Sequence, residues 1–154
     1  IYARGTLVTH VRQSIRSNLV STLTGLATTG ANVYETRVYP LAEDKLPGLA
    51  IYTTSEASDY ATMSPPRTVL RTITASVEIY VKAVSGYDDL VDNISAEIEA
   101  ALNADRTRAG HARDTRVVSF ESQFSGDPDQ PVGSAVLQVE VDYQTLENSA
   151  EIAR

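Results

Sequence analysis

Residues 67–82 read RTVLRTITASVEIYVK. Apolar and polar side chains alternate along this run, which is the period of a strand with one buried face. The face expected in the core carries Val69, Arg71, Ile73, Ala75, Val77, Ile79 and Val81. At about 3.3 Å per residue the run would extend about 50 Å, longer than a typical strand. We therefore expect part of it to bend or to project beyond its sheet.

Two segments show the helical period instead. Residues 7–26 form the first amphipathic helix, with Thr6 or Thr9 as N-cap, and its apolar stripe is Leu7, Val11, Ile15, Leu19 and Leu23. The second helix begins at Ser85, Gly86 or Asp88, and its apolar stripe is Leu90, Ile94, Ile98, Ala101 and Leu102. Its first turns hold Asp88, Asp89 and Asp92, where the helix dipole favours anions. Each helix can bury one stripe against a sheet.

Four further β-rich segments complete the order α-β-β-β-α-β-β when the long run is counted as the third strand. They are residues 32–39, 49–54, 115–125 and 135–144. In residues 115–125 we expect the core face to carry Val118, Phe120, Ser122 and Phe124. This order lacks the strict βαβ alternation of a parallel doubly wound sheet. It predicts an α+β fold: a mostly antiparallel sheet with two amphipathic helices packed on one face and long projecting loops. At 154 residues the chain is expected to be a single domain, residues 1–154, with a frayed tail after Leu146.

Composition excludes several classes of protein. The chain has no cysteine and no tryptophan, so disulfide scaffolds, thiol catalysis and Cys-ligated metals are excluded. Thirteen basic and 20 acidic residues give a net charge of −7, which argues against a broad phosphate-binding face. No apolar run approaches the roughly 20 residues of a membrane span. With two histidines and no HExxH, Gly-x-Ser-x-Gly or glycine-rich phosphate loop, we expect no enzyme, no cofactor and no metal site.

Three loops hold the candidate interaction residues. Residues 55–66 form a long loop with Asp59, Tyr60 and Met63, and Arg67 follows it. A loop of this length suits a partner contact, although a loop folded back on its own domain is an equal alternative. The polar loop 103–114 carries Arg106, Arg108 and Arg113, which could meet DNA phosphate or, as we favour, an acidic neighbouring subunit. Asp127 and Asp129 lack the spacing of a calcium loop, so they supply charge to a solvated turn.

Several of these segments together resemble a known family. They are residues 23–34 (LTGLATTGANVY), residues 37–41 (RVYPL), residues 46–52 (LPGLAIY), the long strand, and residues 136–143 (VLQVEVDY). The combination resembles the tail terminator proteins of long-tailed bacteriophages, the family that includes minor tail protein U of lambda-like phages. The resemblance extends from about Val8 to Tyr143.

The resemblance implies a virion structural protein without catalytic activity. It implies a hexameric ring at the head-proximal end of the tail, assembled in the host cytoplasm, which contacts the tail tube protein and the head-completion or neck protein. DNA would pass through the lumen without specific binding, and Asp127 and Asp129 are candidates for charge on the lumen or rim. Residues 55–66 are the first choice for contact with the tube or a neighbouring subunit. Two alternatives remain at this stage: another ring-forming neck or tail-tube component, and a small-ligand-binding regulatory domain.

Overall fold

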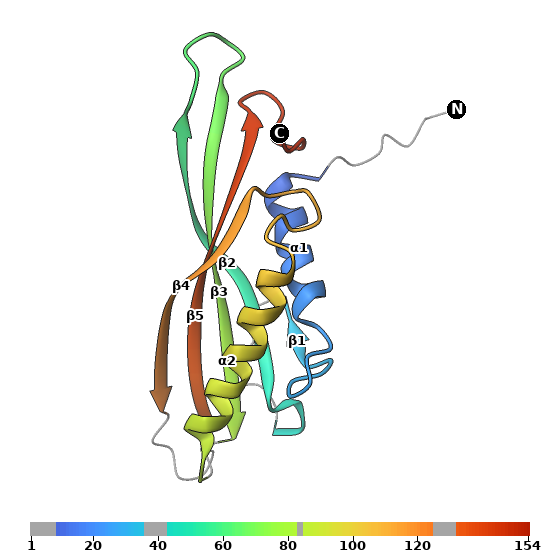
Figure 1. Cartoon of the computed structure of the whole chain (residues 1–154), viewed down its shortest axis with the longest axis vertical. Coiled ribbons are helices and arrows are strands. Elements are labelled where there is room, and N and C mark those ends of the chain that lie inside the picture. Colours follow the sequence, from blue (N-terminus) through green and yellow to red (C-terminus); the bar gives the residue numbers. More distant parts are fainter. Residues whose placement is uncertain (1–8, 36–42, 83–84, 125–131) are drawn as a thin grey trace, which may run out of the picture.

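The computed structural model describes residues 9–35, 43–82, 85–124 and 132–154 (Figure 1). The elements are α1 (Val11–Leu23), β1 (Val33–Tyr34), a short 3-10 helix (Glu43–Lys45), β2 (Gly48–Tyr60), β3 (Thr68–Lys82), α2 (Tyr87–Ala104), β4 (Asp114–Phe124) and β5 (Val132–Leu146). The order of helices and strands is the expected one, and the α+β fold class is confirmed.

The strands form one sheet in the order β1-β2-β3-β5-β4, in which only the β1–β2 pair is parallel. The central strand β3 pairs with β5 along its whole length, from Thr68 opposite Leu146 to Lys82 opposite Val132. Of the two expected outcomes, bending or projection beyond the sheet, projection is excluded for β3 by this pairing. Its length is accommodated by the strong twist of the sheet, which makes the strands cross in projection (Figure 1).

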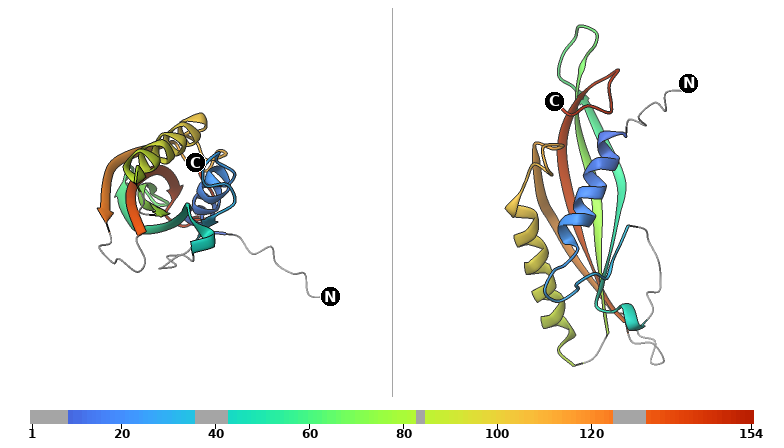
Figure 2. Two further views of the ribbon diagram at one scale, coloured as in Figure 1. Left: turned by 90° about the horizontal axis from the view of Figure 1, so that it is seen from below. Right: turned by 90° about the vertical axis from the view of Figure 1, so that its right-hand side faces the viewer.

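Both helices cover the same face of the sheet (Figure 2). Each contributes one buried stripe: Val11, Ile15, Leu19 and Leu23 from α1, and Val91, Ile94, Ile98 and Leu102 from α2. These side chains pack on the expected face of β3, in one cluster with Ile73, Ala75, Val77, Ile79 and Val81. At about 1.5–3 kcal/mol for each fully buried aliphatic side chain, this layer supplies most of the driving force for folding.

The two ends of the chain differ from expectation. Helix α1 begins at Val11 because the side chain of His10, not a threonine, caps it: His10 Nδ1 accepts the backbone N–H of Arg12 at 3.0 Å. The tail is not frayed, since Ala150 O accepts the N–H of Val11 at 3.0 Å. The expected first strand, residues 32–39, is reduced to β1 among the described residues, and residues 36–39 of it lie outside them.

The expectation of a long loop at residues 55–66 is wrong, and this difference matters more for the site. Strand β2 continues to Tyr60, and its second half pairs with β3 after a register shift between Thr53 and Ser55. Only residues 61–67 connect the two strands. This half of β2 is exposed almost throughout, so no alternating apolar pattern marks it as a strand. We call residues 55–73 the arm, because its connecting loop extends beyond the ends of the helices and of β5 (Figure 1).

Candidate functional site

The tip of the arm presents apolar side chains to solvent. Met63 is 94% exposed and Tyr60 is 51% exposed. The guanidinium of Arg67 lies over the Tyr60 ring, with 4.2 Å from Cζ to the ring centroid. Arg67 Nε also donates to Glu147 Oε2 at 2.9 Å, and Arg67 N donates to Glu147 Oε1 at 3.0 Å. These contacts join Arg67, at one end of the connecting loop, to Tyr60 at the other end and to Glu147, the residue after β5. The base of the loop is therefore held in place before any partner arrives.

The Glu147 carboxylate stays ionised in this clamp. The hydrogen bonds from the backbone and then the side chain of Arg67 lower the pKa of Glu147 below its ordinary value. A charged acceptor strengthens both bonds relative to neutral ones. The clamp therefore operates across the neutral pH range.

The base of the arm is tied to the helical layer through Glu56. The Glu56 side chain is 11% exposed and accepts Arg12 Nη2 from α1 at 2.7 Å. Arg12 Nε donates to the other carboxylate oxygen at 3.2 Å, which makes the pair bidentate. Arg71 Nη1 from β3 contributes a third bond at 3.3 Å, and the Tyr143 hydroxyl from β5 donates a fourth. One carboxylate thus joins α1, β2, β3 and β5.

The cluster is charged at neutral pH. Burial alone raises the pKa of Glu56, but the hydrogen bonds from Arg12 and Tyr143 outweigh it, so the pKa lies below its ordinary value. Burial and the bond to Glu56 raise the pKa of Tyr143, which stays a neutral donor. Burial, with Arg12 and Arg71 nearby, lowers the pKa of His10, so this cap stays a neutral acceptor. The electrostatics therefore hold the arm against α1.

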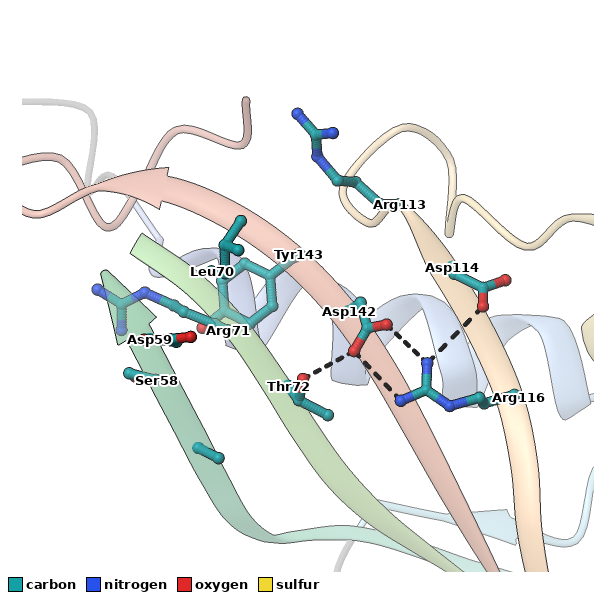
Figure 3. A pocket seen from close by; sticks show the side chains of 11 residues that line it. Ser58, Asp59, Leu70, Arg71, Thr72, Arg113, Asp114, Arg116, Asp142 and Tyr143 are labelled. Carbon is teal, nitrogen blue, oxygen red and sulfur yellow. Dashed lines mark hydrogen bonds and ion pairs between the residues drawn. The ribbon is translucent and has the colours of Figure 1, made fainter. Parts of the chain in front are cut away.

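A groove of about 490 Å³ lies beside the arm base, between β2, β3, β5 and β4 (Figure 3). Arg116 pairs there with Asp142 at 2.6 Å, and Thr72 Oγ1 donates to the same carboxylate at 2.7 Å. Arg116 also pairs with Glu140 at 2.5 Å. These groups satisfy one another, and Asp59 and Arg113 also line the groove. Within the described ranges, no three histidine or carboxylate side chains come together closely enough to bind a metal ion.

The structure brings some of the expected interaction residues together and separates others. Asp59, Tyr60, Met63 and Arg67 share the arm. Arg106 and Arg113 are exposed before the start of β4, and Arg113 lines the same groove as Asp59 of the arm. Asp127 and Asp129 lie outside the described residues.

The expected interface role of Arg108 is wrong, because this residue is 0% exposed and cannot contact a neighbouring molecule. The guanidinium donates to Leu102 O at 2.7 Å and to Asp105 O, which are carbonyls at the end of α2. Such carbonyls have no partner within the helix itself. Arg108 and Ala109 take positive φ values of 49° and 57°, which turn the loop back so that this side chain reaches the helix end. Arg108 therefore closes α2.

Sequence reasoning missed the Glu56 cluster, although one signal was available. Arg71 occupies the apolar face of residues 67–82, in register with Val69 and Ile73. A charge on a buried face requires a partner of opposite sign. The alternation therefore indicated a buried carboxylate, but it could not identify Glu56 as that residue.

Comparisons with known proteins identify no family. No family model matches the sequence, and no curated protein matches it. A chain in a solved structure titled "Virion of native gene transfer agent (GTA) particle" is similar, at 16% identity and a TM-score of 0.34. The match covers 92% of this chain and 99% of that chain. That neighbour belongs to a virion particle, and so weak a likeness carries no argument about this chain. Among the described helices, none is long and apolar enough to cross a membrane.

Proposed function

We propose that this chain is a virion structural protein of the tail terminator type. Copies close into a hexameric ring on the head-proximal end of the tail tube, stop its polymerisation and provide the docking surface for the head and neck. The chain acts in this role as one domain, residues 1–154, without catalysis, and DNA passes through the lumen without specific binding. The support is the sequence resemblance over about residues 8–143, together with the geometry of the arm.

The tip of the arm is the observation that carries the proposal. A partner that covers a methionine that is 94% exposed gains free energy by removing apolar surface from water. The base of the loop is also held in place by the bonds of Arg67 to Glu147, which reduces the conformational entropy lost on docking. An ordered apolar projection of this kind is typical of an anchor that inserts into a neighbouring protein. In our proposal that neighbour is the adjacent copy in the ring.

A second apolar surface lies on the opposite edge of the sheet. Val118 and Phe120 of β4 are each 47% exposed. Strand β4 is one edge of the sheet, whereas the arm belongs to the β2 side. A closed ring needs two unlike surfaces that meet head to tail. The arm and the β4 edge are two such surfaces on one subunit.

Methionine oxidation tests the role of the tip. Met63 is the one methionine in the chain, and there is no cysteine or tryptophan, so peroxide has a single preferred target. The sulfoxide is polar, and we expect the oxidised protein to lose the rings that untreated protein forms in electron micrographs. Met63→Leu is the matched control and should form rings before and after treatment. Unchanged rings from fully oxidised protein would contradict the role of the tip.

A further inference from the structure

The outer half of β2 has one edge without a strand partner in the described part of the chain. Residues 55–60 pair with β3 on one side, whereas β1 covers only the start of β2 on the other side. Ala61 N donates to Thr68 O at 2.8 Å, so the N–H of Ala61 points towards β3. Successive residues of an antiparallel ladder point their N–H and C=O groups to alternate sides. The main-chain groups of Ser58 therefore point away from β3.

Strand β4 is the edge at the other side of the sheet. Among the described residues it pairs only with β5. Residues 118–123 are exposed on both faces. Lysine and proline commonly protect edge strands from pairing with another chain, and β4 contains neither. The register shift between Val117 and Ser119 also lies early in the strand, so residues 119–124 continue as a regular ladder with an open edge.

The two open edges run in opposite directions. Each neighbouring pair in the order β2-β3-β5-β4 is antiparallel, so β2 and β4 are antiparallel to each other. In a cyclic ring whose axis follows the strands, all copies have the same orientation. The β2 edge of one copy then meets the β4 edge of the next in the antiparallel direction. The alternation of strand direction therefore continues from one copy to the next without interruption.

The aromatic side chains of the two edges also lie on the same face of the sheet. Tyr60 pairs with Val69, which shares its face of β3 with the core residue Ile73, and Phe120 pairs with the buried Leu137. Tyr60 is 51% exposed and Phe120 is 47% exposed. Cross-strand pairs of aromatic side chains stabilise a sheet. Joining the two edges places both rings on one continuous face.

We propose that residues 55–60 of one copy add to β4 of the next copy through main-chain hydrogen bonds, an inference that rests on the proposed function. Strand addition to an open edge pairs main-chain groups, and the alternate side chains make it selective. The occupant is a second copy because each chain carries one edge of each kind. The two edges are unlike, so their contact is heterologous, which is the kind that generates rings. Residues 55–60 lead directly into the tip, so the same neighbour receives Met63.

Disulfide cross-linking tests the pairing and its face. The chain has no cysteine, so each introduced thiol is the intended one. Within one copy β2 and β4 are three strand spacings apart, about 14 Å, which is too far for a disulfide. One variant combines Ser58→Cys with Phe120→Cys, and another combines it with Ser122→Cys, since all three positions share the face of the helices. After mild oxidation we expect at least one of them to give a ladder of covalent multimers on a denaturing gel.

Two controls separate strand addition from general proximity. Ser58→Cys with Glu121→Cys places the second thiol on the opposite face of β4, so this variant should give no ladder. Ser58→Pro removes an N–H that points away from β3, so the ladder within the chain is kept but the edge is blocked. We expect its rings to require at least tenfold more protein. Ser58→Ala keeps the N–H and should form rings like the original chain, and circular dichroism checks that each variant folds.

The outcomes distinguish this inference from the proposed function. Rings of the original chain, with no ladder from either variant of the shared face or an equal ladder from the Glu121→Cys control, would overturn strand addition and leave the ring itself intact. Rings of Ser58→Pro at the original protein concentration would do the same. If those rings no longer bind tail tubes, the edge of β2 pairs with the tube protein and not with a second copy. An original chain that forms no ring, alone or on tubes, would overturn both.

Discussion

Glu56→Gln measures how firmly the arm is tied to the helical layer. The Arg12 side chain is 39% exposed and can return to water, so loss of its ion pair costs about 1 kcal/mol after solvent screening. The Arg71 side chain is only 14% exposed and would keep its hydrogen bond to the Thr145 hydroxyl at 3.1 Å but lose its carboxylate partner, which costs about 1–3 kcal/mol. The Tyr143 hydroxyl can still donate to the amide oxygen. The expected total is about 2–4 kcal/mol.

Urea unfolding measures this loss as a lower midpoint at an unchanged slope. Glu35→Gln is the matched control, since it removes the 3.1 Å ion pair between Glu35 and Arg16. Arg16 lies on α1, as Arg12 does. Glu35 is 47% exposed, and we expect its loss to cost less than about 1 kcal/mol. Equal losses in the two variants, or a loss below about 0.5 kcal/mol for Glu56→Gln, would refute the assignment of Glu56 as the tie of the arm.

Three further predictions concern the stability of the fold. Arg108→Met keeps the buried stem but leaves Leu102 O without its donor, so we expect urea unfolding to show a loss of about 2–4 kcal/mol; no loss would show that the helix end needs no cap. Hydrogen bonds from the Thr107 hydroxyl and the Ala109 N–H lower the pKa of Asp105 to about 2, so its contribution is present above about pH 4 and is lost as the pH falls towards 2. Asp105→Asn should therefore flatten the acid side of the stability profile, and an unchanged profile would contradict this. Gly133→Ala would place a Cβ 2.8 Å from Tyr87 Cδ2, so a loss of about 1–3 kcal/mol is expected in thermal melts, and a smaller loss in a Tyr87→Leu background.

The parts of the fold that could be predicted are those in which one face is buried. The alternation of residues 67–82 and the fourfold spacing within α1 and α2 follow directly from burial against a single core. These patterns predict the element order and the side of each helix that packs. The second half of β2, residues 55–60, has no buried face of this kind, so its sequence resembles a loop.

Strand β4 shows a second limit of the period-two pattern. Val118 and Phe120 were expected in the core, but each is 47% exposed. A register shift between Val117 and Ser119 adds one residue to β4, so the alternation before the shift does not continue after it. After the shift Phe120 lies opposite the buried Leu137, on the face that was expected, and it is exposed all the same. Val117, which was expected on the outer face, packs against the core instead. A bulge of this kind leaves no clear signal in the sequence.

Some candidate site residues could be predicted from the type of side chain. Others could not, because their role depends on how a loop turns back on the fold. Tyr60 and Met63 were identified because apolar side chains beside two prolines suit a partner contact, and the structure places both in solvent. Arg108 was misassigned because a polar loop gives no sign that one of its arginines turns inward to the end of a helix.

The central claim is that copies of this chain close into a ring. Its most direct test is the solution mass by light scattering over a wide concentration range, with negative-stain images of the same samples and of samples mixed with tail tubes. The account predicts closed rings of about six subunits with a central hole, either free or on one end of a tube. Open filaments, or a monomer that leaves the tubes uncapped, would contradict it.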